Sequence, residues 1–257
     1  MSDDEARRFA LEHAHYDEDV PFYRAAAARL GSPVLDLGAA TGRLALPLAR
    51  DGAEVWALDR SPAMRAELRR ALAGEPPEVR ARVRVVGGDM RRLALGRRFP
   101  LVMIAMNTLQ ALTDPEDQVA ALRCAREHLA PGGELIFDVA LPDPAEIAGS
   151  LGVERPGGRH RDPASGRCLR HSAWYDTWDP VSQTLAFTLR VVARGGGGPP
   201  EERLRRHRVH VFTPSELRHL LARAGLRPLA VAGDFAGGPV TAASERQVYR
   251  CAAVEGG

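Results

Sequence analysis

The residues best suited to bind a ligand begin where a short apolar run turns through two glycines. After Val34 and Leu35 the chain reads Asp36, Leu37, Gly38, Ala39, Ala40, Thr41, Gly42 and Arg43. Glycine adopts backbone angles closed to other residues and places no Cβ in front of a ligand. An apolar strand that turns through glycines into a helix therefore predicts a ligand site at the carboxyl end of a strand in an α/β sheet. A tight turn without a ligand is the alternative, because this glycine spacing is common by chance.

Two aspartates follow later apolar runs at the same relative place. Asp59 lies about twenty residues beyond Gly38, where an acid can accept hydrogen bonds from ribose hydroxyls. Asp89, next to Met90, ends the following run, and a carboxylate there is suited to accept from the exocyclic amine of adenine. Taken singly, Asp59 is equally compatible with capping the next helix, and Asp89 with a solvated turn. Together with the glycine turn, they predict a nucleoside site.

Alternating short apolar runs and helical patterns position these residues. Between residues 33 and 142, β-branched runs alternate with segments such as Met64, Leu68 and Leu72, whose spacing is helical. This alternation is typical of βαβ units around a parallel sheet. We therefore expect a cofactor-binding βαβ core over residues 33–142, preceded by amino-terminal helices in residues 1–32.

Beyond residue 142 the pattern changes. Residues 143–167 are rich in proline, glycine and charge, which predicts a loop with one helical turn. Residues 185–191 and 203–212 alternate with a period of two, which predicts an antiparallel hairpin. Because strands resume after it, we interpret residues 143–212 as an inserted β lid.

The last part of the chain predicts a helix and strands that complete the sheet. Thr213, Pro214 and Glu216 form a capping-box pattern at the start of a helix. Two further apolar runs follow it, so that residues 213–257 are expected to supply a closing helix and strands. The sequence as a whole, residues 1–257, thus predicts a single domain.

These motifs resemble those of the class I S-adenosylmethionine-dependent methyltransferases, from about Tyr16 to Cys251. The likeness is carried by the glycine turn, by Asp59, by Asp89 with Met90, and by residues 129–133. The segments 232–235 and 244–246 are similar to members that act on small molecules, such as the sugar N-methyltransferases. The resemblance implies an α/β fold with the Rossmann-like seven-stranded class I methyltransferase sheet and an inserted antiparallel β lid. It also implies S-adenosyl-L-methionine as cofactor and S-adenosyl-L-homocysteine as product.

The resemblance further implies which residues contact the cofactor. They are Asp36, Gly38, Ala39, Ala40, Thr41, Gly42, Arg43, Asp59, Arg60, Met64, Asp89, Met90, Met106, Asn107, Tyr16 and Tyr23. Family members usually carry three glycines in the turn, and here Ala40 replaces the middle one. The cofactor has no pyrophosphate that requires bare N–H groups, so an alanine is compatible with binding. Tyr16 and Tyr23, expected in the amino-terminal helices, resemble tyrosines that close over the methionine end of the cofactor.

Asn107 and His210 are the candidate catalytic residues. Methyl transfer from a sulfonium is an in-line displacement that disperses positive charge, so positioning and exclusion of water can supply most of the acceleration. The resemblance implies that residues after the fourth strand, such as Asn107, face the acceptor. Histidine titrates near neutral pH and suits a general base. Helix capping by Asn107 and ordinary packing of His210 are the alternatives. No metal is expected, because Ala105, Met106 and Asn107 lack the acid that holds magnesium in catechol-type methyltransferases.

Composition limits the partners. All 35 cationic side chains are arginine, and with 33 acids the formal charge is +2, which favours neither a nucleic acid nor a membrane. The absence of lysine excludes mechanisms that need its amine, such as the pyridoxal phosphate Schiff base. Residues 151–223 carry 13 arginines and 7 acids, which indicates RNA, an anionic small-molecule acceptor or merely a solvated strand face. Without a signal-peptide pattern or a long apolar run, a cytoplasmic protein is expected.

The main prediction is therefore an enzyme that transfers a methyl group from S-adenosylmethionine to a nitrogen or oxygen of a small molecule. A non-catalytic S-adenosylmethionine-binding module remains open, since methyl transfer requires no fixed nucleophile. An RNA methyltransferase is disfavoured, because no Pro-Pro-aromatic motif follows Asn107. An NAD-dependent oxidoreductase is disfavoured because its Gly-x-Gly-x-x-Gly turn, which meets a pyrophosphate, is absent.

Overall fold

The computed structural model describes residues 2–14, 16–162 and 165–254, and the chain forms two compact units. Unit 1 comprises Met1–Leu141 and Phe212–Gly257, and unit 2 comprises Pro142–Val211. The chain thus leaves unit 1 after residue 141 and returns to it at residue 212. Each unit is built on a sheet of its own.

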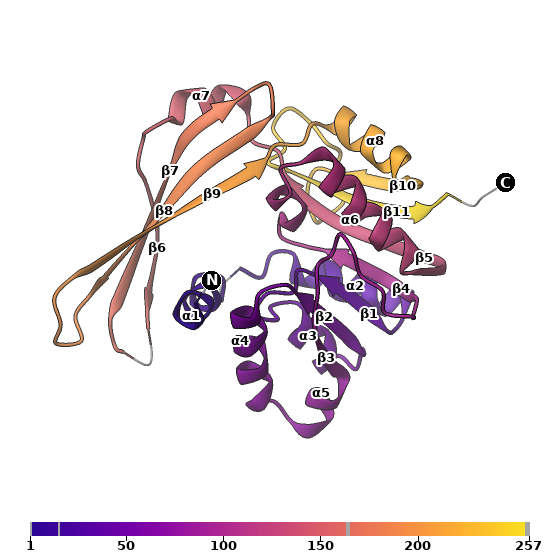
Figure 1. Ribbon diagram of the computed structural model, residues 1–257, viewed down its shortest axis with the longest axis horizontal. Coiled ribbons are helices and arrows are strands. Elements are labelled where there is room, and N and C mark those ends of the chain that lie inside the picture. Colours follow the sequence, from indigo (N-terminus) through magenta and orange to yellow (C-terminus); the bar gives the residue numbers. More distant parts are fainter. Residues whose placement is uncertain (1, 15, 163–164, 255–257) are drawn as a thin grey trace. The chain divides into compact units, whose positions relative to one another are not determined.

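Unit 1 contains a seven-stranded sheet with the order β10, β11, β5, β4, β1, β2, β3 (Figure 1). The strands are β1 Val34–Leu37, β2 Val55–Asp59, β3 Val83–Gly87, β4 Phe99–Ile104, β5 Leu129–Ala140, β10 Leu226–Ala232 and β11 Arg246–Ala253. Strands β1 to β5 pair in parallel, whereas β11 is antiparallel to both β5 and β10. Strand β1 is buried at every position, as expected of a parallel strand covered on both faces. The predicted α/β fold with a seven-stranded sheet is confirmed.

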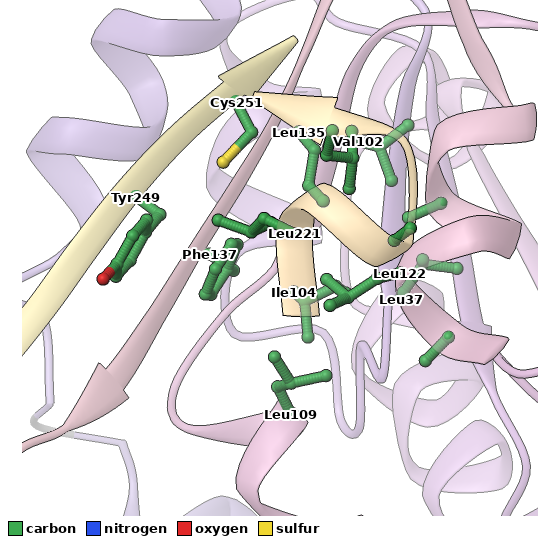
Figure 2. Close-up of a cluster of buried hydrophobic side chains, with 14 of the residues drawn as sticks. Leu37, Val102, Ile104, Leu109, Leu122, Leu135, Phe137, Leu221, Tyr249 and Cys251 are labelled. Carbon is green, nitrogen blue, oxygen red and sulfur yellow. The ribbon is translucent and has the colours of Figure 1, made fainter. Parts of the chain in front are cut away.

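Helices cover both faces of this sheet. One face packs against α6 Pro115–Glu127, α8 Pro214–Arg223 and the short 3₁₀ helix η1 Thr108–Ala111. The other face packs against α2 Val20–Leu30, α3 Ala45–Arg50, α4 Pro62–Ala73 and α5 Pro77–Arg82, and α1 Asp3–Glu12 contacts α4. In the first layer Phe137 of β5 stacks on Tyr249 of β11 with ring centroids 4.9 Å apart, beside Leu221 of α8 (Figure 2). Apolar burial on both faces fixes the strands whose ends carry the candidate site.

Two helices in unit 1 begin at the residues that the capping patterns indicate. The Ser61 hydroxyl accepts from the Met64 amide at 3.4 Å, and Pro62 is the first residue of α4. Thr213 and Glu216 form a reciprocal capping box at the start of α8. Such bonds satisfy amides that have no partner within the helix. The helix start predicted at Thr213 is confirmed.

A segment of unit 1 whose composition is typical of a turn lies inside a strand. The Pro-Gly-Gly segment at residues 131–133 belongs to β5, where the pairing with β4 shifts register. Phe99 pairs with Leu129, but Leu101 pairs with Glu134, so the residues between them form an irregularity in the strand. Pairing with the neighbouring strand β4 places this segment in a strand, whereas its local sequence indicates only a turn.

Unit 2 contains a four-stranded antiparallel sheet and the helix α7. Its elements are α7 Pro144–Ser150, β6 Arg155–Arg161, β7 Cys168–Asp179, β8 Thr184–Arg194 and β9 Glu201–His210, with the sheet order β6, β7, β8, β9. The predicted hairpin corresponds to β8 and β9. The prediction of a loop over residues 143–167 is wrong for β6, an edge strand whose register with β7 shifts between Pro156 and Arg159. Proline and glycine disfavour strands locally, and pairing with β7 overrides that preference.

Candidate functional site

A cavity of about 250 Å³ lies at the carboxyl ends of β1, β2 and β3. It is lined by Gly38, Ala40, Leu58, Asp59, Arg60, Ser61, Met64, Gly88, Asp89, Met90, Thr108, Ala111 and Leu112. Pockets for drug-sized ligands measure about 300–1,000 Å³. The cavity therefore suits one part of a larger cofactor, and its place at the strand ends is where α/β sheets bind ligands.

The turn after β1 is held by backbone bonds and left-handed residues. The amides of Gly38 and Ala39 both donate to the Leu58 carbonyl at 2.8 Å. Gly38 has a φ of +85°, and a Cβ there would lie 2.5 Å from Cγ2 of Thr108. Ala40 has a φ of +48°, a conformation that costs a residue with a side chain about 1–2 kcal/mol. Glycine is thus required at position 38 by both angle and space, and Ala40 retains a backbone shape that glycine would adopt without strain.

Gly42 serves helix packing. It also has a left-handed φ of +88°, and a Cβ there would overlap Cδ1 of Leu68 in α4. Gly42 does not line the cavity. The second glycine of the turn therefore lets α4 approach closely.

Asp59 joins the glycine turn to the start of α4. Its Oδ2 accepts from the Ala40 amide at 3.0 Å, and its Oδ1 accepts from the Ser61 amide at 2.7 Å. A carboxylate has about four acceptor positions, so each oxygen can take a further hydrogen bond. Asp59 fixes the turn and also presents acceptors at the cavity.

Asp89 is held by an arginine that the sequence reasoning missed. Arg91 donates through its backbone amide to Oδ1 at 3.0 Å and through Nη2 to Oδ2 at 2.5 Å. Arg91 also donates to Asp117 at 2.6 Å. The hydrogen bonds from the Arg91 side chain lower the pKa of Asp89 to about 2. Asp89 is therefore ionised and oriented at neutral pH, and the acid-x-Arg spacing is the signal that could have indicated it.

A buried aspartate of β5, also missed, holds the turn after β4. The Asp138 carboxylate accepts from the amides of Met106 and Asn107 at 2.9 and 3.2 Å and from the Tyr23 hydroxyl at 2.8 Å. Asp138 and Tyr23 are both fully buried. Burial raises the pKa of Asp138, and burial beside this carboxylate raises the pKa of Tyr23 well above its ordinary value. An acid inside the otherwise apolar run of residues 135–139 was the available sequence signal.

A second cluster ties the α1–α2 connection to the glycine turn. Arg43 donates to both carboxylate oxygens of the buried Asp19, at 2.5 and 2.7 Å, and lies 4.9 Å from the ring centroid of Tyr16. The Tyr16 hydroxyl accepts from Arg246 at 2.9 Å. The expectation that Tyr16 lies in a helix is wrong: it lies between α1 and α2, where Arg43 also binds its carbonyl at 3.2 Å.

Asp36 is buried in β1 beside this cluster. Burial raises its pKa to about 7, and the charge of Arg43 opposes that rise. A carboxylate with this pKa changes its charge near neutral pH. Its charge state is therefore sensitive to any cation that binds nearby.

Some of the predicted site residues line the cavity, and others do not. The predicted residues that line it are Gly38, Ala40, Asp59, Arg60, Met64, Asp89 and Met90, and those that do not are Asp36, Ala39, Thr41, Gly42, Arg43, Met106, Asn107, Tyr16 and Tyr23. The lining residues not anticipated are Leu58, Ser61, Gly88, Thr108, Ala111 and Leu112. Most of these neighbour a predicted residue in sequence, whereas η1 reaches the cavity through the tertiary fold.

The two candidate catalytic residues lie in different units. Asn107 is exposed in unit 1 with a φ of +59°, and its side chain makes no capping bond to η1. His210 is a buried residue at the end of β9 in unit 2, opposite Thr184. Their roles stay predictions.

Known proteins share both the sequence motifs and the fold. A family profile described as "Methyltransferase domain" matches residues 34–133. The CcbJ methyltransferase from Streptomyces caelestis is 31% identical, with a TM-score of 0.75 over 93% of this chain and 90% of that one. The chain belongs to the class I S-adenosylmethionine-dependent methyltransferases. The cypemycin N-terminal methyltransferase from a Streptomyces species is 29% identical to this methyltransferase over 85% of the chain and 82% of the relative.

A further solved structure similar to this methyltransferase contains S-adenosyl-L-homocysteine. The glycopeptide N-methyltransferase MtfA, complexed with S-adenosyl-L-homocysteine, is 26% identical with a TM-score of 0.60, over 98% of this chain and 87% of that one. Among the residues that the structure describes, no group of three or more His, Cys, Asp or Glu side chains could hold a metal ion. Within the same residues, no helix has the length and hydropathy needed to cross a membrane.

Proposed function

We propose that this methyltransferase transfers a methyl group from S-adenosyl-L-methionine to a nitrogen or oxygen of a small-molecule acceptor, and that the cavity of unit 1 holds the nucleoside end of the cofactor. The observation that carries this proposal is the convergence of Asp59, Asp89 and the glycine turn at one cavity. Support for the acceptor class comes from the N-methyltransferases among the relatives.

The residues of the cavity fit a nucleoside. Asp59 has acceptor positions left for ribose hydroxyls after its two backbone bonds. Asp89, fixed by Arg91, is an ionised acceptor suited to an exocyclic amine. Apolar side chains such as Met64 and Leu112 can pack against the flat face of a base. Two carboxylates would repel a pyrophosphate, which agrees with a nucleoside that carries no phosphate.

The chain contributes binding and positioning. S-adenosyl-L-methionine, when bound, supplies a methyl group activated by a sulfonium. Asp59 and Asp89 would orient the nucleoside, and the carboxyl groups of Asp36, Asp19 and Asp138 are buried near one another in unit 1. Arg43 pairs with Asp19. Burial raises the pKa values of Asp36 and Asp138, and a cationic ligand beside them would favour their charged forms. Asn107 is our candidate for contact with the acceptor.

Methyl-labelled S-adenosylmethionine tests the proposal. The protein is incubated with the labelled cofactor and with fractionated metabolites, peptides and RNA from a cell extract. We expect label in a small-molecule fraction and stoichiometric S-adenosylhomocysteine. Binding of the cofactor without transfer in any fraction would favour a binding module, and label confined to RNA or protein would overturn the acceptor class.

We further propose that the acceptor carries an anionic group bound by arginines of unit 2. A hollow of about 260 Å³ in that unit is lined by Arg170, Arg190 and Arg194 together with Glu154. Arg190 donates to Glu154 at 3.0 Å and also binds Glu202. Within the described part of unit 2, neither Arg170 nor Arg194 has an acidic partner, so an anion in the hollow would relieve their mutual repulsion.

Substitution of Arg170 tests the anionic acceptor. Once an acceptor is found, Arg170→Ala should raise its Michaelis constant at least fivefold and leave the dissociation constant of S-adenosylmethionine unchanged. Arg80→Ala, which removes an exposed arginine of unit 1, is the matched control. A neutral acceptor, or equal kinetics for both variants, would overturn this part of the proposal.

A further inference from the structure

The turn between β4 and η1 contains two consecutive left-handed residues. Met106 has a φ of +55° and Asn107 a φ of +59°. A left-handed conformation costs a residue other than glycine about 1–2 kcal/mol, less for asparagine. Two such residues in succession persist only where the surroundings hold them. The turn therefore needs a compensating interaction.

Asp138 supplies that interaction from the neighbouring strand. Its Oδ1 accepts from the Met106 amide at 2.9 Å and its Oδ2 from the Asn107 amide at 3.2 Å. The Tyr23 hydroxyl of α2 also donates to Oδ1, at 2.8 Å, and so helps to fix the carboxylate. A buried carboxylate is costly unless its acceptors are used. Three donors from two segments, α2 and the turn after β4, satisfy it here.

The turn leads directly to a wall of the cavity. Thr108 follows it, and its hydroxyl donates to the Ala105 carbonyl at 2.6 Å. The Thr108 methyl group occupies the space that a side chain at Gly38 would fill. Thr108 and Ala111 line the cavity, whereas Asp138 does not. Asp138 can therefore affect the cavity only by determining the shape of the turn.

We propose that Asp138 is a positioning residue for the cofactor cavity: its buried carboxylate holds Met106 and Asn107 in their left-handed conformations and thereby holds Thr108 against the glycine turn. The inference rests on the proposed function, because it takes the cavity to bind S-adenosylmethionine. Tyr23 assists by orienting the carboxylate. Loss of the interaction would let the turn relax and displace the η1 wall of the cavity.

Calorimetry with S-adenosylmethionine on Asp138→Asn tests the proposal. The amide keeps the shape of the side chain, and its oxygen can still accept from Met106, but its NH₂ group faces the Asn107 amide where Oδ2 accepted before. We expect the dissociation constant to rise at least tenfold. Tyr23→Phe leaves both bonds to the turn in place, and we expect a rise of less than fivefold.

Glu134→Gln is the matched control on the same strand. Glu134 is another buried acid of β5, but it binds Arg29 and Arg250 and does not line the cavity. We expect a lower melting temperature with a dissociation constant within twofold of the wild type. If Asp138→Asn matches this control in affinity while folded, the carboxylate only stabilises the fold and the proposal is overturned.

Two further measurements separate the turn from general stability. Met106→Gly in the Asp138→Asn background should recover at least a third of the lost affinity, since glycine adopts the left-handed conformation without strain. Hydrogen exchange over residues 105–112 should be at least tenfold faster in Asp138→Asn and unchanged in Glu134→Gln. Hydrogen exchange needs no cofactor. If the wild type binds no S-adenosylmethionine, the proposed function fails, but the exchange measurement still tests whether Asp138 holds the turn. Unchanged exchange in Asp138→Asn would show that Asp138 does not hold the turn.

Discussion

Replacing Asp59 by alanine would remove two functions at once. The carboxylate binds the amides of Ala40 and Ser61, at 3.0 and 2.7 Å, and lines the cavity where we propose that ribose binds. Alanine leaves both amides without this acceptor and removes the acceptors offered to the ligand. We therefore expect Asp59→Ala to weaken cofactor binding and to destabilise unit 1.

The size of each effect follows from these bonds. A hydrogen bond to a charged group contributes about 1.5–3 kcal/mol, so loss of one net bond to ribose should raise the dissociation constant by about 10- to 150-fold. The amides of Ala40 and Ser61 are partly buried, and loss of their acceptor should cost about 1 kcal/mol each. Asp59→Asn keeps one acceptor oxygen and should lie between alanine and the wild type in both measurements.

Calorimetry and thermal unfolding separate the two effects. Thr213→Ala is the control, because Thr213 also accepts from a backbone amide as the cap of α8 but does not line the cavity. Its loss should cost about 1 kcal/mol of stability without changing affinity. If folded Asp59→Ala binds S-adenosylmethionine as tightly as the wild type, the assignment of Asp59 to the ribose is wrong.

Three other outcomes can be measured. Burial raises the pKa of Glu134, but hydrogen bonds from two arginines outweigh burial and lower the pKa to about 2. The ionised Glu134 therefore stabilises the folded state above the ordinary glutamate pKa, and this stabilisation is lost as the pH falls toward 2. Glu134→Gln should accordingly cost about 2 kcal/mol in urea unfolding at pH 7 and less at pH 3, and an equal cost at both values would contradict the reasoning. The pKa of Asp36 is about 7, so affinity for the cationic cofactor should rise from pH 6 to pH 8, and calorimetry should find a flatter profile in Asp36→Asn. Gly42→Ala adds a methyl group that overlaps Leu68 and should cost about 1–3 kcal/mol, so an unchanged melting temperature would argue against the packing role.

Local signals account for most of the core elements of unit 1. The starts of α4 and α8 follow from Ser61 and from the Thr213 capping box, because a cap bonds to amides only two or three residues away. The edge strand β6 and the irregularity in β5 are fixed instead by pairing with β7 and β4. Such pairing depends on residues distant in sequence, and local composition indicates the opposite structure at both places.

The candidate site likewise combines features that the sequence determines with features that only the tertiary structure determines. The sequence by itself determined the glycine turn and the acids Asp59 and Asp89, because the carboxyl ends of neighbouring parallel strands meet at one edge of a sheet. It also determined the family, whose motifs lie at those strand ends. Only the tertiary structure decided that Gly42 makes room for α4 and that Arg91, which orients Asp89, also binds Asp117 of α6.

Asp138 shows why tertiary structure was needed. Its three donors are Tyr23 on α2 and the amides of Met106 and Asn107 in the turn after β4. The turn residues lie 32 and 31 positions before Asp138 in sequence, and Tyr23 lies 115 positions before it. No local pattern connects an acid in an apolar strand with the backbone angles of a distant turn. The burial of Asp138 and the satisfaction of its acceptors are properties of the packed fold, since only packing excludes water and leaves the protein to supply every hydrogen bond.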